Sequence, residues 1–246
     1  MSNSPHGLWL FVSPGFRRFN QPVLARLNEH VDIRVWQFSQ TADEPCCIET
    51  VLDLVHDYVS QQSEPLHLLG HSLSGVVALL YARRYPERVK SLTLLSVDSN
   101  PVISWHVHYY SLREMLPCNR KAVLYQMVRL LFGPQSPRQE SGTARLLGKI
   151  LDTEFTLHSL AQRHILSPGG IEVPLLVCHG ESDMILDSNS QIQWNHWLKP
   201  GDRRWTCAEG RHFFHYEYPT RVRQTIVDFW QHSSQPSSMP LIQLAS

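Results

Sequence analysis

The sequence predicts an α/β protein, in which a mostly parallel central sheet is flanked by helices. Short runs of leucine and β-branched residues alternate with longer helical patterns, which is typical of βαβ units. The 246 residues are 42% hydrophobic and 18% charged, which is enough apolar material for a large core. The alternation stops after Asp98 and resumes at residue 171, which predicts one sheet interrupted by an inserted segment.

The first part of the chain accounts for most of the predicted sheet. Apolar runs indicate four strands, at residues 8–12, 32–38, 66–69 and 89–97. Helical spacing predicts helices between them, at about 21–29, at 48–60 and from Ser72 to Arg84. The turn Ser13-Pro14-Gly15-Phe16 follows the first strand.

The segment 99–170 has no strand-like run, only helical patterns such as 121–132 and 143–151, and we interpret it as a helical cap. Strands at 173–178 and 204–207 then complete the sheet, with helices near 190–197 and 220–230. Residues 1–98 and 171–231 therefore form the predicted core. Residues 232–246, rich in Ser, Pro and Gln, are expected to form a flexible tail.

Charge and composition exclude several classes of protein. The 22 Lys and Arg residues balance 22 Asp and Glu residues, and no basic stripe indicates nucleic-acid binding. No apolar run approaches the roughly 20 residues of a membrane-spanning helix. The N-terminus lacks a basic region before residues 8–12, so we expect a cytoplasmic protein without a secretory signal. Five cysteines without metal-binding spacing predict free thiols and no metal site.

The turn Gly70-His71-Ser72-Leu73-Ser74-Gly75 lies between a buried strand and a helix. Small residues on both sides of a serine suit a strained strand-to-helix turn that exposes its hydroxyl as a nucleophile. A serine that merely caps the helix would look the same. The turn therefore needs partners elsewhere in the chain, because a serine hydroxyl requires a base and an orienting acid.

Two later loops supply those partners. Strand 173–178 runs into a loop that carries Asp183, the predicted acid, and the strand that follows it leads to His212, the predicted general base. Ligands of open α/β sheets bind at the carboxyl ends of the strands, where both loops lie. The order Ser, Asp, His along the chain differs from the orders of chymotrypsin and subtilisin.

Three ordered motifs resemble those of the α/β-hydrolase superfamily: Gly70-His71-Ser72-Leu73-Ser74, Gly180-Glu181-Ser182-Asp183, and His212-Phe213 with Glu217-Tyr218-Pro219. The resemblance covers residues 8–230 except the cap. It implies catalysis by Ser72, Asp183 and His212, with no metal or organic cofactor. It also implies an oxyanion hole made by the backbone N–H groups of Phe16 and Leu73.

The sequence departs from the family pattern at four places. Ser74 replaces the second glycine of the turn, and Arg211 separates Gly210 from His212. Pro14-Gly15-Phe16 replaces the His-Gly turn after the first strand. The usual Asp-x-x-Gly-x-Gly loop is absent at residues 36–41, so the substrate pocket is expected to differ from those of relatives.

Other residues compete for these roles. Asp98 ends strand 89–97 and is the alternative acid, while His215 is an alternative base that is better explained by packing or capping. His71 is expected to support the turn structurally. His106 and His108 have a spacing that suits a metal, but no third ligand accompanies them.

The cap is apolar and aromatic, and we expect Trp105, Tyr109, Tyr110 and Met127 to line the substrate pocket. Residues 99–170 contain eight basic residues and four acidic ones. This excess is either a solvated face or a feature that steers an anionic substrate, such as a carrier-bound acyl group. The eight basic residues are Arg113, Arg120, Lys121, Arg129, Arg138, Arg145, Lys149 and Arg163.

These features predict a serine hydrolase that cleaves a carboxylic ester or thioester of a largely apolar small molecule through an acyl-enzyme on Ser72. Because the same fold and triad support other reactions, the alternatives are a lyase, a C–C hydrolase, an acyltransferase or a cofactor-free peroxidase. A non-catalytic binding protein with a vestigial triad is a further alternative.

Overall fold

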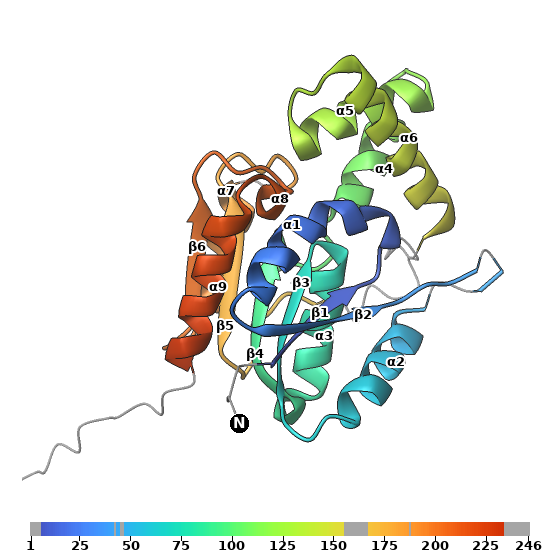
Figure 1. Ribbon diagram of the computed structural model, residues 1–246. Coiled ribbons are helices and arrows are strands. Elements are labelled where there is room, and N and C mark those ends of the chain that lie inside the picture. The colour runs from blue at the N-terminus through green and yellow to red at the C-terminus, as the bar shows by residue number, and fades with distance from the viewer. Residues whose placement is uncertain (1–5, 42, 45–46, 155–166, 187, 234–246) are drawn as a thin grey trace, which may run out of the picture.

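A computed structural model describes residues 6–41, 43–44, 47–154, 167–186 and 188–233. Its centre is a sheet of six parallel strands in the order β2-β1-β3-β4-β5-β6 (Figure 1). This sheet confirms the predicted fold class. The strands are β1 (His6–Phe11), β2 (Asp32–Gln37), β3 (Leu66–His71), β4 (Val89–Leu95), β5 (Leu175–Gly180) and β6 (Arg203–Cys207).

The burial of each strand agrees with its position in the sheet. Every residue of β3 and β5 is buried, as expected for strands that are covered on both faces. The edge strands β2 and β6 alternate or mix exposed and buried positions. Parallel strands need crossover connections, and helices provide them here.

Two pairs of helices cover the sheet. Helices α2 (Ile48–Ser60) and α3 (Leu73–Arg84) pack on one face, and α1 (Arg17–Asn28) and α9 (Pro219–Ser233) pack on the other. Short helical elements complete the core: η1 (Pro14–Phe16), η2 (Pro86–Arg88), α7 (Ser188–Gln193), η4 (Trp194–His196) and α8 (Phe214–Glu217).

The predicted insertion is helical and comprises α4 (Trp105–Met115), α5 (Arg120–Phe132) and α6 (Pro137–Thr153), which Figure 1 shows as a group above the sheet. Side chains of Ser104, Asn119 and Ser136 cap the starts of these helices. The limits 99–170 stay a prediction, since residues 155–166 lie outside the described part of the chain. Arg163 and most of the predicted tail, residues 234–246, also lie outside it.

Several sequence expectations concern isolated features. Cys47, Cys118, Cys178 and Cys207 are free thiols, and Cys46 lies outside the described residues. Among the described helices, none is both long and apolar enough to cross a membrane. Within the same residues, no group of three His, Cys, Asp or Glu side chains is placed to hold a metal ion.

Candidate active site

Ser72 occupies a strained turn between β3 and α3. Its φ of 49° lies in the left-handed region, where side chains other than glycine are uncommon. A Cβ atom on Gly70 would lie 2.6 Å from the backbone of Gly75, and one on Gly75 would lie 2.4 Å from the side chain of Val97. The two glycines let the strand, the turn and the helix pack this closely.

The serine at the second glycine position of the motif has a contact of its own. The Ser74 hydroxyl accepts a buried hydrogen bond of 3.1 Å from the Val12 amide. Val12 directly follows β1, so this bond ties the turn to the loop after the neighbouring strand. The glycine that makes close backbone contact is Gly75, one position further on.

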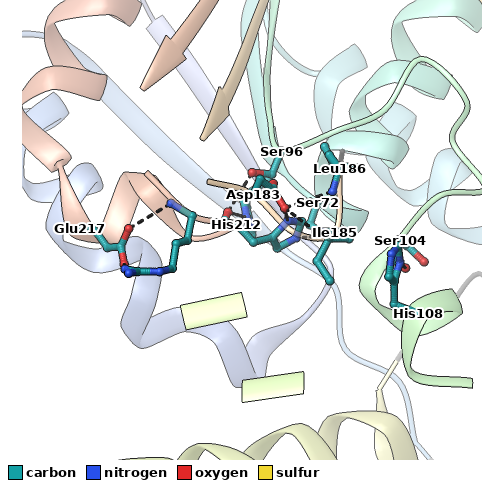
Figure 2. A network of polar contacts seen from close by, with 11 residues as sticks. Ser72, Ser96, Ser104, His108, Asp183, Ile185, Leu186, His212 and Glu217 are labelled. Atoms are coloured by element: carbon teal, nitrogen blue, oxygen red, sulfur yellow. Dashed lines mark hydrogen bonds and ion pairs between the residues drawn. The ribbon is translucent and has the colours of Figure 1, made fainter. Parts of the chain in front are cut away.

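The structure brings the three predicted catalytic side chains together, as Figure 2 shows. His212 Nε2 lies 3.3 Å from Ser72 Oγ, and His212 Nδ1 lies 2.9 Å from Asp183 Oδ2 and 3.2 Å from Oδ1. All three residues are buried. The loops after β3, β5 and β6 therefore converge at one end of the sheet.

The surroundings of Asp183 favour its charged form. Burial alone would raise the pKa of this carboxyl group, but the charge and hydrogen bond of His212 outweigh it, so the pKa is lowered. The amides of Ile185 and Leu186 contribute by donating to Oδ1 at 2.8 and 3.1 Å. An ionised Asp183 then holds a proton on His212 Nδ1 and leaves Nε2 facing the serine.

The backbone of His212 is also fixed. Its carbonyl accepts hydrogen bonds from His71 Nε2 at 2.9 Å and from the Ser96 hydroxyl at 2.8 Å. Burial, together with nearby His215 and His212, holds the pKa of His71 well below its ordinary value. A neutral His71 that donates to a carbonyl carries its proton on Nε2. Its position supports the turn, in line with the structural role expected for it.

His215 packs beside His71. Its Nε2 lies 2.7 Å from Asn20 Oδ1, and its ring centroid is 4.3 Å from that of His71. Burial lowers the pKa of His215 to about 3, so the imidazole is neutral. The structure therefore gives His215 the packing role and gives His212 the contact with Ser72.

The other candidate residues make contacts elsewhere. Asp98 Oδ1 accepts from the Asn100 amide at 2.6 Å, whereas both carboxylate contacts to His212 Nδ1 come from Asp183. His106 packs on Trp105, with ring centroids 4.0 Å apart. His108 bonds to the Ser104 carbonyl within α4, away from the Ser72 group in Figure 2.

Comparison with known proteins agrees with this architecture. The alpha/beta hydrolase fold family matches residues 61–117, which include the Ser72 turn. Uncharacterized protein sll0249 of Synechocystis sp. is 43% identical over 91% of this chain and 89% of its own length. Uncharacterized protein alr2406 of Nostoc sp. is 37% identical over 94% of this chain and 92% of its own.

The chain belongs to the α/β-hydrolase superfamily. Among solved structures, serine hydrolase CCSP0084 from Cycloclasticus zankles superposes with a TM-score of 0.66. The alignment covers 96% of this chain and 92% of that one at 16% identity, a level at which the likeness concerns the fold alone.

A small cavity adjoins Ser72. Its volume is about 10 Å³, room for about one water molecule. Trp105 lies in its wall with Phe11 and Phe16. The other three predicted pocket residues lie elsewhere, because Tyr109 and Met127 are buried in the cap cluster and Tyr110 is partly exposed. The cavity therefore supports only the assignment of Trp105.

The Ser13–Phe16 loop, which the family resemblance assigns to the oxyanion hole, has backbone amides that already donate hydrogen bonds to other groups. The Phe16 amide donates to the Ser13 carbonyl at 3.0 Å within η1, and the Gly15 amide donates to Glu154 Oε1 at 2.8 Å. Phe16 N–H is thus not free to hold an oxyanion in this conformation. Leu73 begins α3, where an amide has no acceptor within the helix, and it lines the cavity.

Sequence reasoning missed Glu154, Ser96 and Asn20. Glu154 reaches Gly15 across 139 positions, a separation that no local pattern reveals. Ser96 directly follows β4 and has a φ of 50°, which the sequence does not reveal. Asn20 lies in α1, lines the cavity beside Ser72 and contacts His215.

Proposed function

We propose that the protein is a serine hydrolase that cleaves a carboxylic ester or thioester through an acyl-enzyme on Ser72. The observation that carries this proposal is the position of His212, with Nε2 3.3 Å from the Ser72 hydroxyl and Nδ1 2.9 Å from Asp183. A base in this position can take the serine proton, and a carboxylate behind it stabilises the resulting imidazolium.

The reaction follows from this geometry in two steps. Ser72 Oγ attacks the acyl carbon while His212 Nε2 takes its proton, and the same proton then passes to the departing alcohol or thiol. Water next attacks the acyl-enzyme, gives a proton to His212, and the carboxylic acid leaves as Ser72 regains its hydrogen. Asp183 keeps the His212 tautomer throughout.

The oxyanion must be held by backbone amides. The Leu73 N–H at the start of α3 is one donor. A second donor from the Ser13–Phe16 turn requires that the Phe16 amide leave the Ser13 carbonyl. Since removal of one donor costs about 10²–10³ in rate in other hydrolases, the opening of this turn is expected to influence turnover.

The lining of the cavity favours an apolar acyl group. Phe11, Phe16 and Trp105 form the apolar part of the wall beside Ser72, and Ser13 and Asn20 belong to its polar part. Because about 10 Å³ cannot admit an acyl chain, substrate binding has to displace part of this wall. Trp105 belongs to the cap helix α4, so cap movement is the simplest route.

A fluorophosphonate probe tests the nucleophile directly. We expect the wild-type protein to be labelled and Ser72→Ala to lose the label. Ser13→Ala is the matched control, because its hydroxyl lines the same cavity and should leave labelling in place. Labelling that persists in Ser72→Ala would refute the assignment. A panel of p-nitrophenyl esters of increasing acyl length then tests ester hydrolysis and the apolar acyl site.

A further inference from the structure

A second and larger groove lies where the cap meets the core. Its volume is about 770 Å³. Arg18 and Phe19 of α1 form one side, Phe132 and Arg138 of the cap form another, and Arg211 and Glu217 come from the loop and short helix beside His212.

The groove carries more positive than negative charge. Three arginines line it, against the single carboxylate of Glu217, which pairs with Arg211 at 3.0 Å. Arg18 Nη2 instead donates to the neutral Thr143 hydroxyl at 3.3 Å. By contrast, cap residues Arg120 and Arg129 are neutralised outside the groove by Asp152 and Glu140. Of the cap's basic residues, Arg138 is the one that lines this groove.

Arg138 occupies a position that helix stability does not favour. It is the second residue of α6, whose amino-terminal end carries partial positive charge, and cations stabilise the opposite end of a helix. Arg138 is exposed, so its guanidinium is accessible to a ligand in the groove. An anion bound there would interact favourably with both the side chain and the helix end.

Arg211 is held in place by the cap. Gly133 ends α5 with a φ of 71°, and a Cβ atom at this position would lie 2.3 Å from Arg211 Nε. The glycine therefore leaves space for the guanidinium of the residue that interrupts the family's Gly-His pattern. Arg211 also donates its amide to Glu217 at 3.2 Å. This departure from the family motif thus forms part of the groove wall.

Aromatic rings separate the groove from the Ser72 cavity. Phe19 and Phe132 line the groove, and Phe16 lines the cavity. Phe213 lies between them, with ring centroids 4.4 Å from Phe132 and 5.1 Å from Phe16. Because Phe213 follows His212 directly, the two spaces share a wall only a few side chains thick.

We infer that this groove binds an anionic group of the substrate, a carboxylate or a phosphate, while the acyl bond is cleaved at Ser72. This inference rests on the proposed hydrolase function and deepens it by naming the charge of the substrate. Arg18 and Arg138 contribute the attraction, and the rings of Phe19 and Phe132 form an apolar floor for the carbon skeleton that joins the anion to the ester.

Three acetate esters of similar size test the inference. 4-Acetoxybenzamide is neutral, 4-acetoxybenzoate carries a carboxylate and 4-acetoxyphenyl phosphate carries a phosphate. We expect kcat/KM to be higher for at least one anionic ester than for the neutral one. The anionic ester with the higher kcat/KM shows whether the groove prefers a carboxylate or a phosphate. Arg138→Ala should lower the anionic-to-neutral ratio about threefold, and Arg18→Ala with Arg138→Ala about tenfold. High salt should lower it as well.

Arg145→Ala is the matched control, because Arg145 lies on the exposed surface of the same helix, α6, and does not line the groove. It should leave the ratio as in wild type. Equal kcat/KM for the neutral and both anionic esters, or an equal fall of the ratio in Arg145→Ala and Arg138→Ala, would overturn the inference.

Binding to the Ser72→Ala protein separates this inference from the hydrolase proposal. Calorimetric titration with 4-acetoxybenzoate and 4-acetoxyphenyl phosphate should show binding of at least one anion that weakens when Arg138→Ala is added. If this holds but wild type cleaves no ester, the groove assignment stands and the hydrolase proposal fails. If wild type cleaves esters but neither anion binds more tightly than the neutral ester, the groove assignment fails alone.

Discussion

The two sides of the Ser72 cavity are built in different ways. On the core side, His212 is fixed through its side chain by Asp183 and through its carbonyl by His71 and Ser96, all of them buried. On the cap side, the wall consists of aromatic rings such as Trp105 and of a loop joined to the cap by one carboxylate, that of Glu154.

The difference separates two requirements of a hydrolase. Proton transfer needs atoms held within hydrogen-bonding distance, which the rigid side provides. Access needs a wall that can move, and contacts between side chains at the cap boundary can be exchanged at lower cost than backbone packing. Because the volume beside Ser72 is small, substrate access requires the cap side of the cavity to move.

Removal of the charge of Asp183, on the core side of the cavity, is expected to have the largest effect on turnover. Asp183→Asn should lower kcat by up to about 10⁴, because the amide no longer enforces the productive tautomer of His212. Steady-state hydrolysis of a p-nitrophenyl ester measures the loss. Asp98→Asn is the control, since Asp98 bonds to the Asn100 amide, and it should change kcat by a few fold at most. A larger loss in Asp98→Asn would exchange the roles of the two acids.

The substitutions Gly70→Ala and Gly15→Ala compare the core side and the cap side through their effect on the free energy of unfolding. At Gly70 the new methyl group meets backbone atoms at 2.6 Å, whereas at Gly15 it meets the side chains of Glu154 and Ile150 at 2.7 Å. We expect Gly70→Ala to cost about 3 kcal/mol of unfolding free energy and Gly15→Ala about 1 kcal/mol. Urea denaturation measures both. Equal costs would contradict the distinction between a rigid and a movable side.

Acid should weaken the core through its buried histidines. Burial and the charge of Lys90 lower the pKa of His67 to about 3, from about 6.5 in the unfolded chain. Below pH 6.5 His67 becomes protonated in the unfolded state but stays neutral in the folded state. The free energy of unfolding therefore falls as the pH drops toward about 3. At pH 5 this group alone costs about 2 kcal/mol relative to neutral pH.

The variant His67→Gln isolates this contribution. Glutamine can keep a contact with the Ser91 hydroxyl, which lies 2.6 Å from His67 Nδ1, and it does not titrate. Urea unfolding at pH 7 and pH 5 should therefore show a smaller acid loss in His67→Gln than in wild type. An unchanged difference between the two pH values would assign the acid sensitivity to other groups.

The contact between Glu154 and Gly15 should have the smallest effect on stability and a specific effect on turnover. Glu154→Ala removes the acceptor of the Gly15 amide and should cost about 1 kcal/mol of unfolding free energy. It also frees the Ser13–Phe16 turn, so we expect kcat/KM for short esters to rise about threefold. Glu154→Gln keeps an acceptor oxygen and should resemble wild type. A fall of kcat/KM in Glu154→Ala would mean that this bond supports the productive loop.

The sequence was sufficient to predict the sheet and the three residues around Ser72. Ser72 and Asp183 follow the strongly apolar strands β3 and β5, whereas His212 follows the more polar edge strand β6. Parallel strands bring their carboxyl ends to one edge. Helix α4 lies within the predicted helical cap, but the sequence does not define its bounds, because its aromatic and histidine-rich start has weak helix propensity. Contacts between distant segments, such as Glu154 with Gly15, have no local signature.

Two expectations about the cap stay predictions, because each depends on packing that the sequence does not reveal. Composition predicts Tyr110 and Met127 in the pocket, whereas the helix face that each residue occupies depends on how α4 and α5 pack. The basic residues were counted without their partners, and Arg120 and Arg129 are paired with acids. Composition gives the number of apolar or basic residues in a segment, whereas packing decides which of them face a pocket or an acidic partner.

The hydrogen bond from Val12 to Ser74 couples the nucleophile to its surroundings. A glycine at residue 74 would lose this bond, whereas the serine adds a link between the turn and Val12 to the pairing of β1 with β3. Any motion of the Ser13–Phe16 loop that carried Val12 along would therefore also displace the turn that holds Ser72. A loop that opens without breaking this bond therefore pivots after Val12, mainly about the backbone bonds of Ser13 and Gly15, because the ring of Pro14 fixes its φ.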